Sequence, residues 1–129
     1  MLSKGETSRE RKEGIEMNQG EVWLCYPPKD TRGHEQKGVR PYVILSNTKW
    51  NKKWLLVTVS PTTTSKKKFH GWDSCVPVDY GGNQKACCLT DRLCSFSHKR
   101  LLKRVGKVSE LELNHITNKR KHVFKRDEK

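Results

Sequence analysis

The residues best suited to chemistry lie in one polar stretch, from Thr31 to Pro41, which reads T-R-G-H-E-Q-K-G-V-R-P. This stretch holds an imidazole, a carboxylate, an amide and three cations, so it could bind an anion and move a proton through His34 or Glu35. Binding loops carried on a rigid scaffold have this composition. The alternative is a solvated loop that Gly33 and Gly38 shape and whose charges only keep the protein soluble.

Overall charge narrows the class of partner. The chain has 129 residues, with 27 Lys and Arg against 14 Asp and Glu, and a formal net charge of +13. Such an excess favours a polyanionic partner through release of counterions, although a basic face can also be merely solvated. RNA, DNA and an acidic protein therefore stay open on charge alone. The length fits a single domain with one core, so we look for one site.

The sequence indicates neither a membrane span nor a secretory signal. It contains no run of 18 apolar residues, and its first residues, M-L-S-K-G-E-T-S-R-E-R-K-E-G, lack the apolar centre of a signal peptide. We therefore expect a cytoplasmic protein with no membrane partner.

The cysteines and histidines do not form a metal-binding pattern. The five cysteines include no C-x-x-C pair and are Cys25, Cys75, Cys87, Cys88 and Cys94. The five histidines have neither H-x-x-x-H nor H-E-x-x-H spacing. An odd number of cysteines without such a pair predicts free, reduced thiols in a cytoplasmic protein. We also expect neither a metal ion nor another cofactor.

Short strands must position the polar loop. Apolar runs predict five of them, at Glu21–Tyr26, Pro41–Leu45, Trp54–Val59, Ser74–Val78 and Ala86–Leu89. The first strand should stop at Pro27 and Pro28, because proline has no amide hydrogen to donate to a ladder. Residues 47–53 and 79–83 should turn the chain. Short strands at this spacing predict a mainly β fold, in the form of a small barrel.

Helical patterns come late in the chain. Phe96–Arg104 could hold a short helical turn. Ser109 and Glu112 have capping-box spacing and start a clearer helix. Leu113 and Ile116 fall on one face of that helix, so it should pack on the barrel.

Both ends of the chain are predicted to be accessory segments. Residues 1–18 are charged and nearly free of large apolar side chains, which predicts a mobile arm, with Met17 as a candidate alternative start. A short helix is the rival interpretation of this arm. Residues 19–118 form the predicted domain, and residues 119–129 form a basic tail that should fray and could add phosphate contacts.

Several separate motifs between Gly20 and Thr117 resemble the MazF/PemK toxin family in order and spacing. They are G-E-V-W-L, G-H-E-Q-K-G-V-R-P followed by Y-V-I-L-S-N, V-S-P-T-T-T-S-K, T-D-R-L-C-S and K-R-V-G-K-V-S-E. The resemblance implies an SH3-like small barrel of the CcdB/PemK type with a C-terminal helix, usually as a homodimer. It also implies the toxin of a type II toxin–antitoxin module that cleaves single-stranded mRNA at short sequences and is neutralised by a cognate acidic antitoxin.

The same motifs place the family's functional residues in this sequence. The resemblance implies that Arg40, in V-R-P, and Thr62, the first of T-T-T, are catalytic, and it makes Glu35 a candidate base. The positions that resemble RNA contacts are His34, Gln36, Lys37, Asn47, Thr63, Ser65, Lys66, Asp91 and Arg92. Arg92 stands where the family usually has glutamine. Because a guanidinium accepts no hydrogen bond, base recognition there should differ from that of other members.

Arg40 and Thr62 also fit RNA cleavage on chemical grounds. A deprotonated 2′-hydroxyl attacks the adjacent phosphorus and gives a 2′,3′-cyclic phosphate and a 5′-hydroxyl, with no metal and no enzyme nucleophile. The protein must stabilise the negative phosphorane, to which the rigid fork of Arg40 can donate twice and Thr62 once. The 2′ proton could go to Glu35 or to His34, whose ordinary pKa suits the task better. We favour Glu35, because the family often has serine or a similar residue at the position of His34.

Two other functions compete with cleavage. A toxin of the same fold can act by binding an enzyme such as DNA gyrase, as the CcdB relatives do, although the pairing of Arg40 with Thr62 argues against it. A plain nucleic-acid-binding barrel would account for the net charge of +13 but would leave the G-H-E-Q-K-G-V-R-P loop unexplained.

The four tryptophans divide by position. Trp23 and Trp54 fall in predicted strands, so we expect both in the core. Trp50 and Trp72 flank loops, where either could stack on an unpaired base or pack in a dimer.

Overall fold

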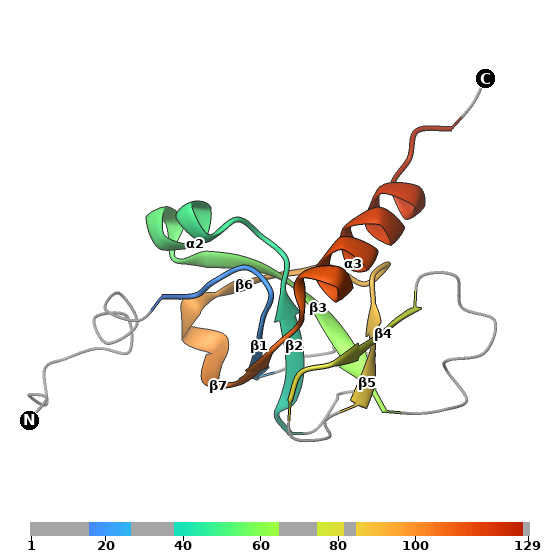
Figure 1. Cartoon of the computed structure of the whole chain (residues 1–129). Helices are drawn as coiled ribbons and strands as arrows, with labels where there is room; N and C mark the ends of the chain where they lie inside the picture. Colours follow the sequence, from blue (N-terminus) through green and yellow to red (C-terminus); the bar gives the residue numbers. More distant parts are fainter. Residues whose placement is uncertain (1–15, 27–37, 65–74, 82–84, 128–129) are drawn as a thin grey trace, which may run out of the picture.

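The computed structural model describes residues 16–26, 38–64, 75–81 and 85–127. Figure 1 shows a twisted sheet with helices against it. The elements are β1 (Glu21–Cys25), β2 (Arg40–Ile44), α2 (Thr48–Trp54), β3 (Leu56–Thr63), β4 (Cys75–Asp79), β5 (Lys85–Leu89), β6 (Cys94–Ser97), η2 (His98–Arg100), β7 (Leu101–Lys107) and α3 (Glu110–Val123). No helix among the described residues is long and apolar enough to cross a membrane.

The strands pair antiparallel in the order β4-β5-β3-β2-β1-β7, and β6 pairs with β3 beyond the end of β5. β3 is long enough to hold two partners in turn, since Leu56–Val59 pair with β6 and Thr62–Thr63 pair with β5. The predicted mainly β fold with a C-terminal helix is confirmed.

The two ends of this strand order come into contact. Gly106 of β7 lies so close to Tyr80, the residue after β4, that a Cβ atom on Gly106 would overlap the Tyr80 carbonyl oxygen. Tyr80 is itself buried in the core. The sheet therefore curves far enough to bring β4 against β7, as a small barrel requires.

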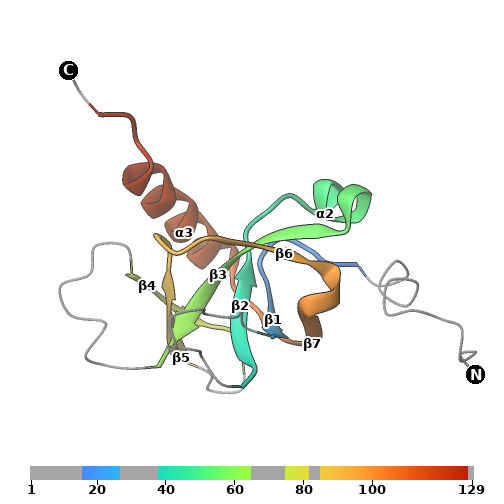
Figure 2. The ribbon, with the colours of Figure 1, turned by 180° about the vertical axis from the view of Figure 1, so that it is seen from behind.

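Side chains on both faces of the sheet are buried. Along β2, Val43 packs into one apolar cluster and Ile44 into another, because successive strand residues point to opposite faces. Trp23 joins the second cluster, which confirms its predicted place in the core. Ile116 of α3 is fully buried in the first cluster, with Leu113 packed beside it. In Figure 2, α3 lies next to β4, and α2 lies at the opposite end of the molecule, next to β3.

α3 starts as predicted and runs further than predicted. The Ser109 hydroxyl accepts a hydrogen bond from the Glu112 amide at 3.1 Å, and the Glu112 carboxylate accepts one from the Ser109 amide at 2.8 Å, which completes the capping box. The helix continues to Val123, so the expectation that residues 119–123 fray is wrong. The basic last turn, which includes Arg120, suits the negative end of the helix dipole.

α2 occupies a segment that we predicted to be only a turn. Asn47 caps this helix, since its side-chain oxygen accepts from the amides of Lys49 at 2.9 Å and Trp50 at 3.4 Å. The helix ends at Leu55, whose φ of 53° is left-handed, and β3 starts only after it. Trp54 is therefore helical and 54% exposed, and its predicted place in a strand and in the core is wrong.

The region from Phe96 to Arg104 is mostly strand. Only His98–Arg100 form a helical turn, which the Ser97 side chain caps, so the predicted turn is right for these residues alone. Phe96 and Leu101 on either side of it are buried in the second cluster, and their strands pair with β3 and β1.

The expectation of free thiols throughout is wrong for one pair. Cys75 and Cys87 are joined by a disulfide, with their Cα atoms 5.7 Å apart. The register of β4 and β5, in which Pro77 faces Cys87, brings the two together, and no spacing in the sequence reveals that register. The disulfide leaves out the other cysteines, which are Cys25, Cys88 and Cys94.

Candidate functional site

Arg40 lies at the start of β2, where the strand leaves the polar loop. It pairs with Cys25 of β1, and its side chain is partly buried. Alternation along β2 puts this side chain on the face of Tyr42. Burial raises the pKa of the Tyr42 phenol, and the charges of Arg40 and Arg100 oppose that rise. Arg100 lies 5.5 Å from the centre of the Phe96 ring, which packs edge-on against Tyr42, so a second cation lies near Tyr42 at this end of the sheet.

Thr62 lies on the neighbouring strand, with its side chain buried. Its hydroxyl donates a hydrogen bond to the backbone carbonyl of Pro41 at 3.0 Å. Because Val43 faces Ser60 in the register, alternation puts Thr62 on the face of Val43, opposite to that of Arg40. The Thr62 hydroxyl thus holds the backbone next to Arg40.

Thr63 lies on the opposite face of the sheet from Thr62. Continuing the register of Tyr42 with Pro61 brings Thr63 beside Arg40, on the same face. Thr63 is partly buried and pairs with Cys87 on its other side. The structure therefore brings Arg40, Thr62 and Thr63 together at one end of the sheet, with hydroxyls on both faces.

Three other residues that resemble RNA contacts lie elsewhere in the chain. Asn47 follows the far end of β2, where it caps α2. Asp91 and Arg92 are exposed in the turn after β5. Thr63 faces Cys87 and Thr62 faces Cys88, so β5 runs antiparallel to β3. The turn after β5 therefore lies away from the end of β3 that is next to Arg40. A single chain does not place these three beside Arg40.

The remaining predicted site residues lie outside the described residues. They are His34, Glu35, Gln36, Lys37, Ser65 and Lys66.

One contact at the Arg40 end was missed by the sequence analysis. Arg100 donates through Nη1 to the carbonyl of Tyr26 at 3.5 Å, and the Tyr26 amide donates to the carbonyl of Arg100 at 3.0 Å. Tyr26 directly follows Cys25, the partner of Arg40. Arg100 thus reaches this end through the pairing of β1 with β7, and nothing local in the sequence indicates it.

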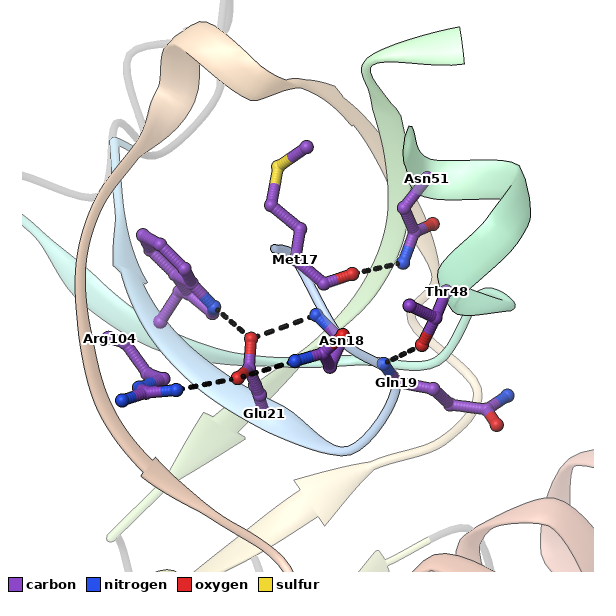
Figure 3. A network of polar contacts seen from close by, with 8 residues as sticks. Met17, Asn18, Gln19, Glu21, Thr48, Asn51 and Arg104 are labelled. Atoms are coloured by element: carbon purple, nitrogen blue, oxygen red, sulfur yellow. Dashed lines mark hydrogen bonds and ion pairs between the residues drawn. The ribbon is translucent and has the colours of Figure 1, made fainter. Parts of the chain in front are cut away.

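A second polar cluster, also missed, surrounds the buried carboxylate of Glu21 (Figure 3). This carboxylate accepts hydrogen bonds from the Asn18 amide at 2.8 Å, the Trp23 indole at 3.1 Å and the Arg104 guanidinium at 2.9 Å. Burial raises the pKa of Glu21, but these hydrogen bonds together outweigh it and hold the pKa below its ordinary value of 4.5. The cluster keeps Glu21 ionised inside the fold.

The segment before β1 is tied to α2 in the same view. The Met17 carbonyl accepts from the buried Asn51 amide at 2.7 Å, and the Gln19 amide donates to the Thr48 hydroxyl at 2.9 Å (Figure 3). Met17 is itself buried in the second cluster. Met17 therefore packs with the domain, whereas residues 1–15 of the predicted arm lie outside the described residues.

The described residues supply cations and hydroxyls rather than metal ligands. No group of three His, Cys, Asp or Glu side chains among them is arranged to hold a metal ion. What the Arg40 end can do chemically is bind an oxyanion through a guanidinium and adjacent hydroxyl donors.

Comparison with known families gives one match over most of the chain. The family described as PemK-like, MazF-like toxin of type II toxin–antitoxin system matches residues 18–124. No curated protein sequence matches.

Solved structures share this fold. MazF from Deinococcus radiodurans superposes with a TM-score of 0.71 at 23% identity, covering 87% of this chain and 99% of that one. An endoribonuclease in complex with its cognate antitoxin, from a mycobacterial species, gives 0.68 at 19% identity over 87% and 98%. The Mycobacterium tuberculosis toxin MazF-mt6 gives 0.65 at 21% identity over 84% and 99%.

Proposed function

Because the chain belongs to the family of PemK-like, MazF-like toxins of type II toxin–antitoxin systems, we propose that it cleaves single-stranded mRNA without a metal ion, at Arg40. One observation carries this proposal: Arg40 stands at a strand end with the hydroxyls of Thr62 and Thr63 on the neighbouring strand. One of the similar structures is an endoribonuclease in complex with its cognate antitoxin.

In the proposed reaction, the 2′-oxygen of one nucleotide attacks the adjacent phosphorus and the 5′-oxygen of the next nucleotide leaves. The products are a 2′,3′-cyclic phosphate and a 5′-hydroxyl, because the leaving 5′-oxygen takes a proton from water or from the base that received the 2′ proton. Arg40 donates two hydrogen bonds to the non-bridging oxygens as negative charge builds on them. Guanidinium keeps its proton near neutral pH, so Arg40 acts as an electrostatic clamp and not as the acid.

Thr62 is the proposed accessory donor. In the free protein its hydroxyl donates to the Pro41 carbonyl, so it must exchange this bond to reach a phosphate. Thr63 lies on the face of Arg40, so its hydroxyl is a second candidate donor on that side of the sheet. We propose Glu35 as the base that takes the 2′ proton, with His34 as its rival.

The further RNA contacts that we propose follow the family motifs. They are His34, Gln36, Lys37, Asn47, Thr63, Ser65, Lys66, Asp91 and Arg92. Since the structure puts Asp91 and Arg92 away from Arg40 within one chain, a homodimer is the arrangement that would bring all of them to one RNA. An acidic antitoxin in the cytoplasm would neutralise this basic surface.

The proposal is tested by incubating purified protein with long, structureless RNA in excess EDTA and mapping the ends of the products. Wild-type protein should cut, while Arg40→Ala should be about 100- to 1000-fold slower. Thr62→Ser should retain activity that Thr62→Val loses, because only serine keeps the hydroxyl. Lys107→Ala, which removes an exposed cation from β7, is the matched control.

Three outcomes would contradict the proposal. Intact RNA with the wild-type protein would favour the gyrase-binding or plain nucleic-acid-binding function. A strict requirement for magnesium would overturn the metal-independent mechanism. Equal rates for Arg40→Ala and Lys107→Ala would remove Arg40 from the site.

A further inference from the structure

α2 exposes two large aromatic side chains. Trp50 and Trp54 lie one helical turn apart and are 53% and 54% exposed. Their ring centroids are 5.7 Å apart and the ring planes are tilted by 50°. With Leu56, which is also exposed, they line a hollow of about 730 Å³ between α2 and η2. Exposed apolar side chains gathered in this way indicate a binding surface.

The surroundings of this aromatic surface are basic. Lys49, Lys52 and Lys53 are exposed on α2, and Lys99 of η2 lines the hollow. The Lys53 ammonium lies 5.2 Å from the centre of the Trp54 ring. No acidic residue is among the described residues that line the hollow. The surface therefore complements a polyanion that also has flat apolar groups.

η2 connects this surface to the Arg40 end of the sheet. Lys99 lines the hollow, and the next residue, Arg100, contacts Tyr26 beside the pairing of Cys25 with Arg40. Arg100 also lies 5.5 Å from the centre of the Phe96 ring, and this ring packs edge-on against Tyr42, two residues along β2 from Arg40. Lys99 and Arg100 thus connect the tryptophan pair of α2 to the end of the sheet where Arg40 lies.

We propose that Trp50 and Trp54, with the lysines around them, bind unpaired bases of the RNA strand on one side of the cleaved bond. This inference rests on the proposed function. Bases stack on tryptophan whatever their sequence, and lysines on flexible stems pair with phosphates. The route from this surface to Arg40 favours RNA over an acidic peptide, because one continuous strand would occupy both.

The test measures binding of 2′-O-methyl RNA, which has no free 2′-hydroxyl and cannot be cleaved by this mechanism. A long and a short unstructured oligonucleotide are compared on full-length protein. Replacing both tryptophans, by Trp50→Ala with Trp54→Ala, should weaken binding of the long oligonucleotide about tenfold or more and leave the short one nearly unchanged. Trp54→Phe should retain more affinity than Trp54→Ala, since phenylalanine still stacks.

Phe124→Ala is the matched control, because Phe124 is 58% exposed, just after α3 and away from α2. It should leave both affinities unchanged. Because both tryptophans are exposed, the double variant should fold, and circular dichroism verifies this. Lys52→Ala with Lys53→Ala should also reduce the salt dependence of binding by about one unit of slope per lysine in contact.

The inference is overturned if the folded double variant binds the long oligonucleotide as tightly as the wild type does. It is equally overturned if the double variant loses only affinity for a synthetic acidic amphipathic peptide, or only self-association in sedimentation. These results differ from failure of the proposed function, in which wild-type protein leaves cleavable RNA intact.

Discussion

Glu21 and Arg40 are two charged residues of the same sheet, and they differ in burial and in the partners of their side chains. Glu21 is buried, and its carboxylate accepts hydrogen bonds from Asn18, Trp23 and Arg104. Arg40 lies at a strand end with its side chain partly exposed. Within the described part of the chain, no carboxylate forms an ion pair with it. Glu21 is saturated by the fold, whereas none of the carboxylates that the structure describes occupies the donors of Arg40.

This difference separates charge that stabilises the protein from charge that is available for function. A buried carboxylate is tolerated only where donors replace its water, so Glu21 fixes the start of β1 against β7. A guanidinium without such partners contributes little to folding and can bind a phosphate. Changes at the two residues should therefore affect different measurements.

The largest expected effect is on cleavage. Arg40→Ala should lower the cleavage rate about 100- to 1000-fold, because a preorganised donor to the developing charge is lost. Its urea unfolding midpoint should stay close to that of the wild type. Arg104→Ala is the matched arginine control, being 61% exposed and bound to Glu21. If both arginine variants lose the same activity, the distinction between the two regions fails.

Glu21→Ala should have the opposite effect, lowering stability and leaving cleavage unchanged. Its removal leaves the buried Trp23 indole and the Asn18 amide without their acceptor, which should cost about 2 kcal/mol of unfolding free energy. Cleavage per folded molecule should be unchanged. Urea unfolding measures the loss, with the exposed Glu16→Ala as control. Unchanged stability of Glu21→Ala would show that the cluster does not hold the fold.

The pH dependence of stability is a second test of the stabilising role of Glu21. The pKa of Glu21 is lower in the folded than in the unfolded protein, so the unfolded state takes up the proton first as the pH falls. The contribution of Glu21 is complete above its ordinary value of 4.5 and is lost as the pH falls through the lower folded value. Glu21→Gln should flatten the acid limb of stability measured by thermal unfolding. An unchanged limb would contradict the assignment.

The smallest expected effect is at the α2 cap. Asn47→Ala should cost about 1 kcal/mol, because the amides of Lys49 and Trp50 lose their acceptor. Asn47→Asp keeps a capping oxygen and should be as stable as the wild type. If chemical denaturation gives the two variants equal losses, Asn47 does not stabilise the helix by capping it.

The sequence predicted elements well where one local rule decides them. The capping box of Ser109 and Glu112, the buried strand around Trp23 and the β class all follow from local patterns. It failed where tertiary contacts decide. Asn51 anchors α2 through the Met17 carbonyl, and Leu55 takes a left-handed conformation in an apolar run, so W-L-L-V did not become one strand.

In the candidate site, too, local motifs identified some residues and tertiary structure alone brought in the others. Arg40 and Thr62 were found from motifs, and both lie at the same strand end. Their opposite faces, and the position of Thr63 beside Arg40, depend on the register of β2 and β3, which the sequence does not specify. Arg100 and Glu21 belong to clusters that only the pairing of β1 with β7 assembles.

The central claim is that the RNA supplies its own nucleophile and Arg40 stabilises the charge that results. Its most direct test uses one RNA sequence, cleaved by the wild-type protein in EDTA, and the same strand with the 2′-hydroxyl removed at the nucleotide before the mapped cut. We predict cleavage of the first to a 2′,3′-cyclic phosphate and no cleavage of the second at that bond. Equal cleavage of both strands there would contradict the account.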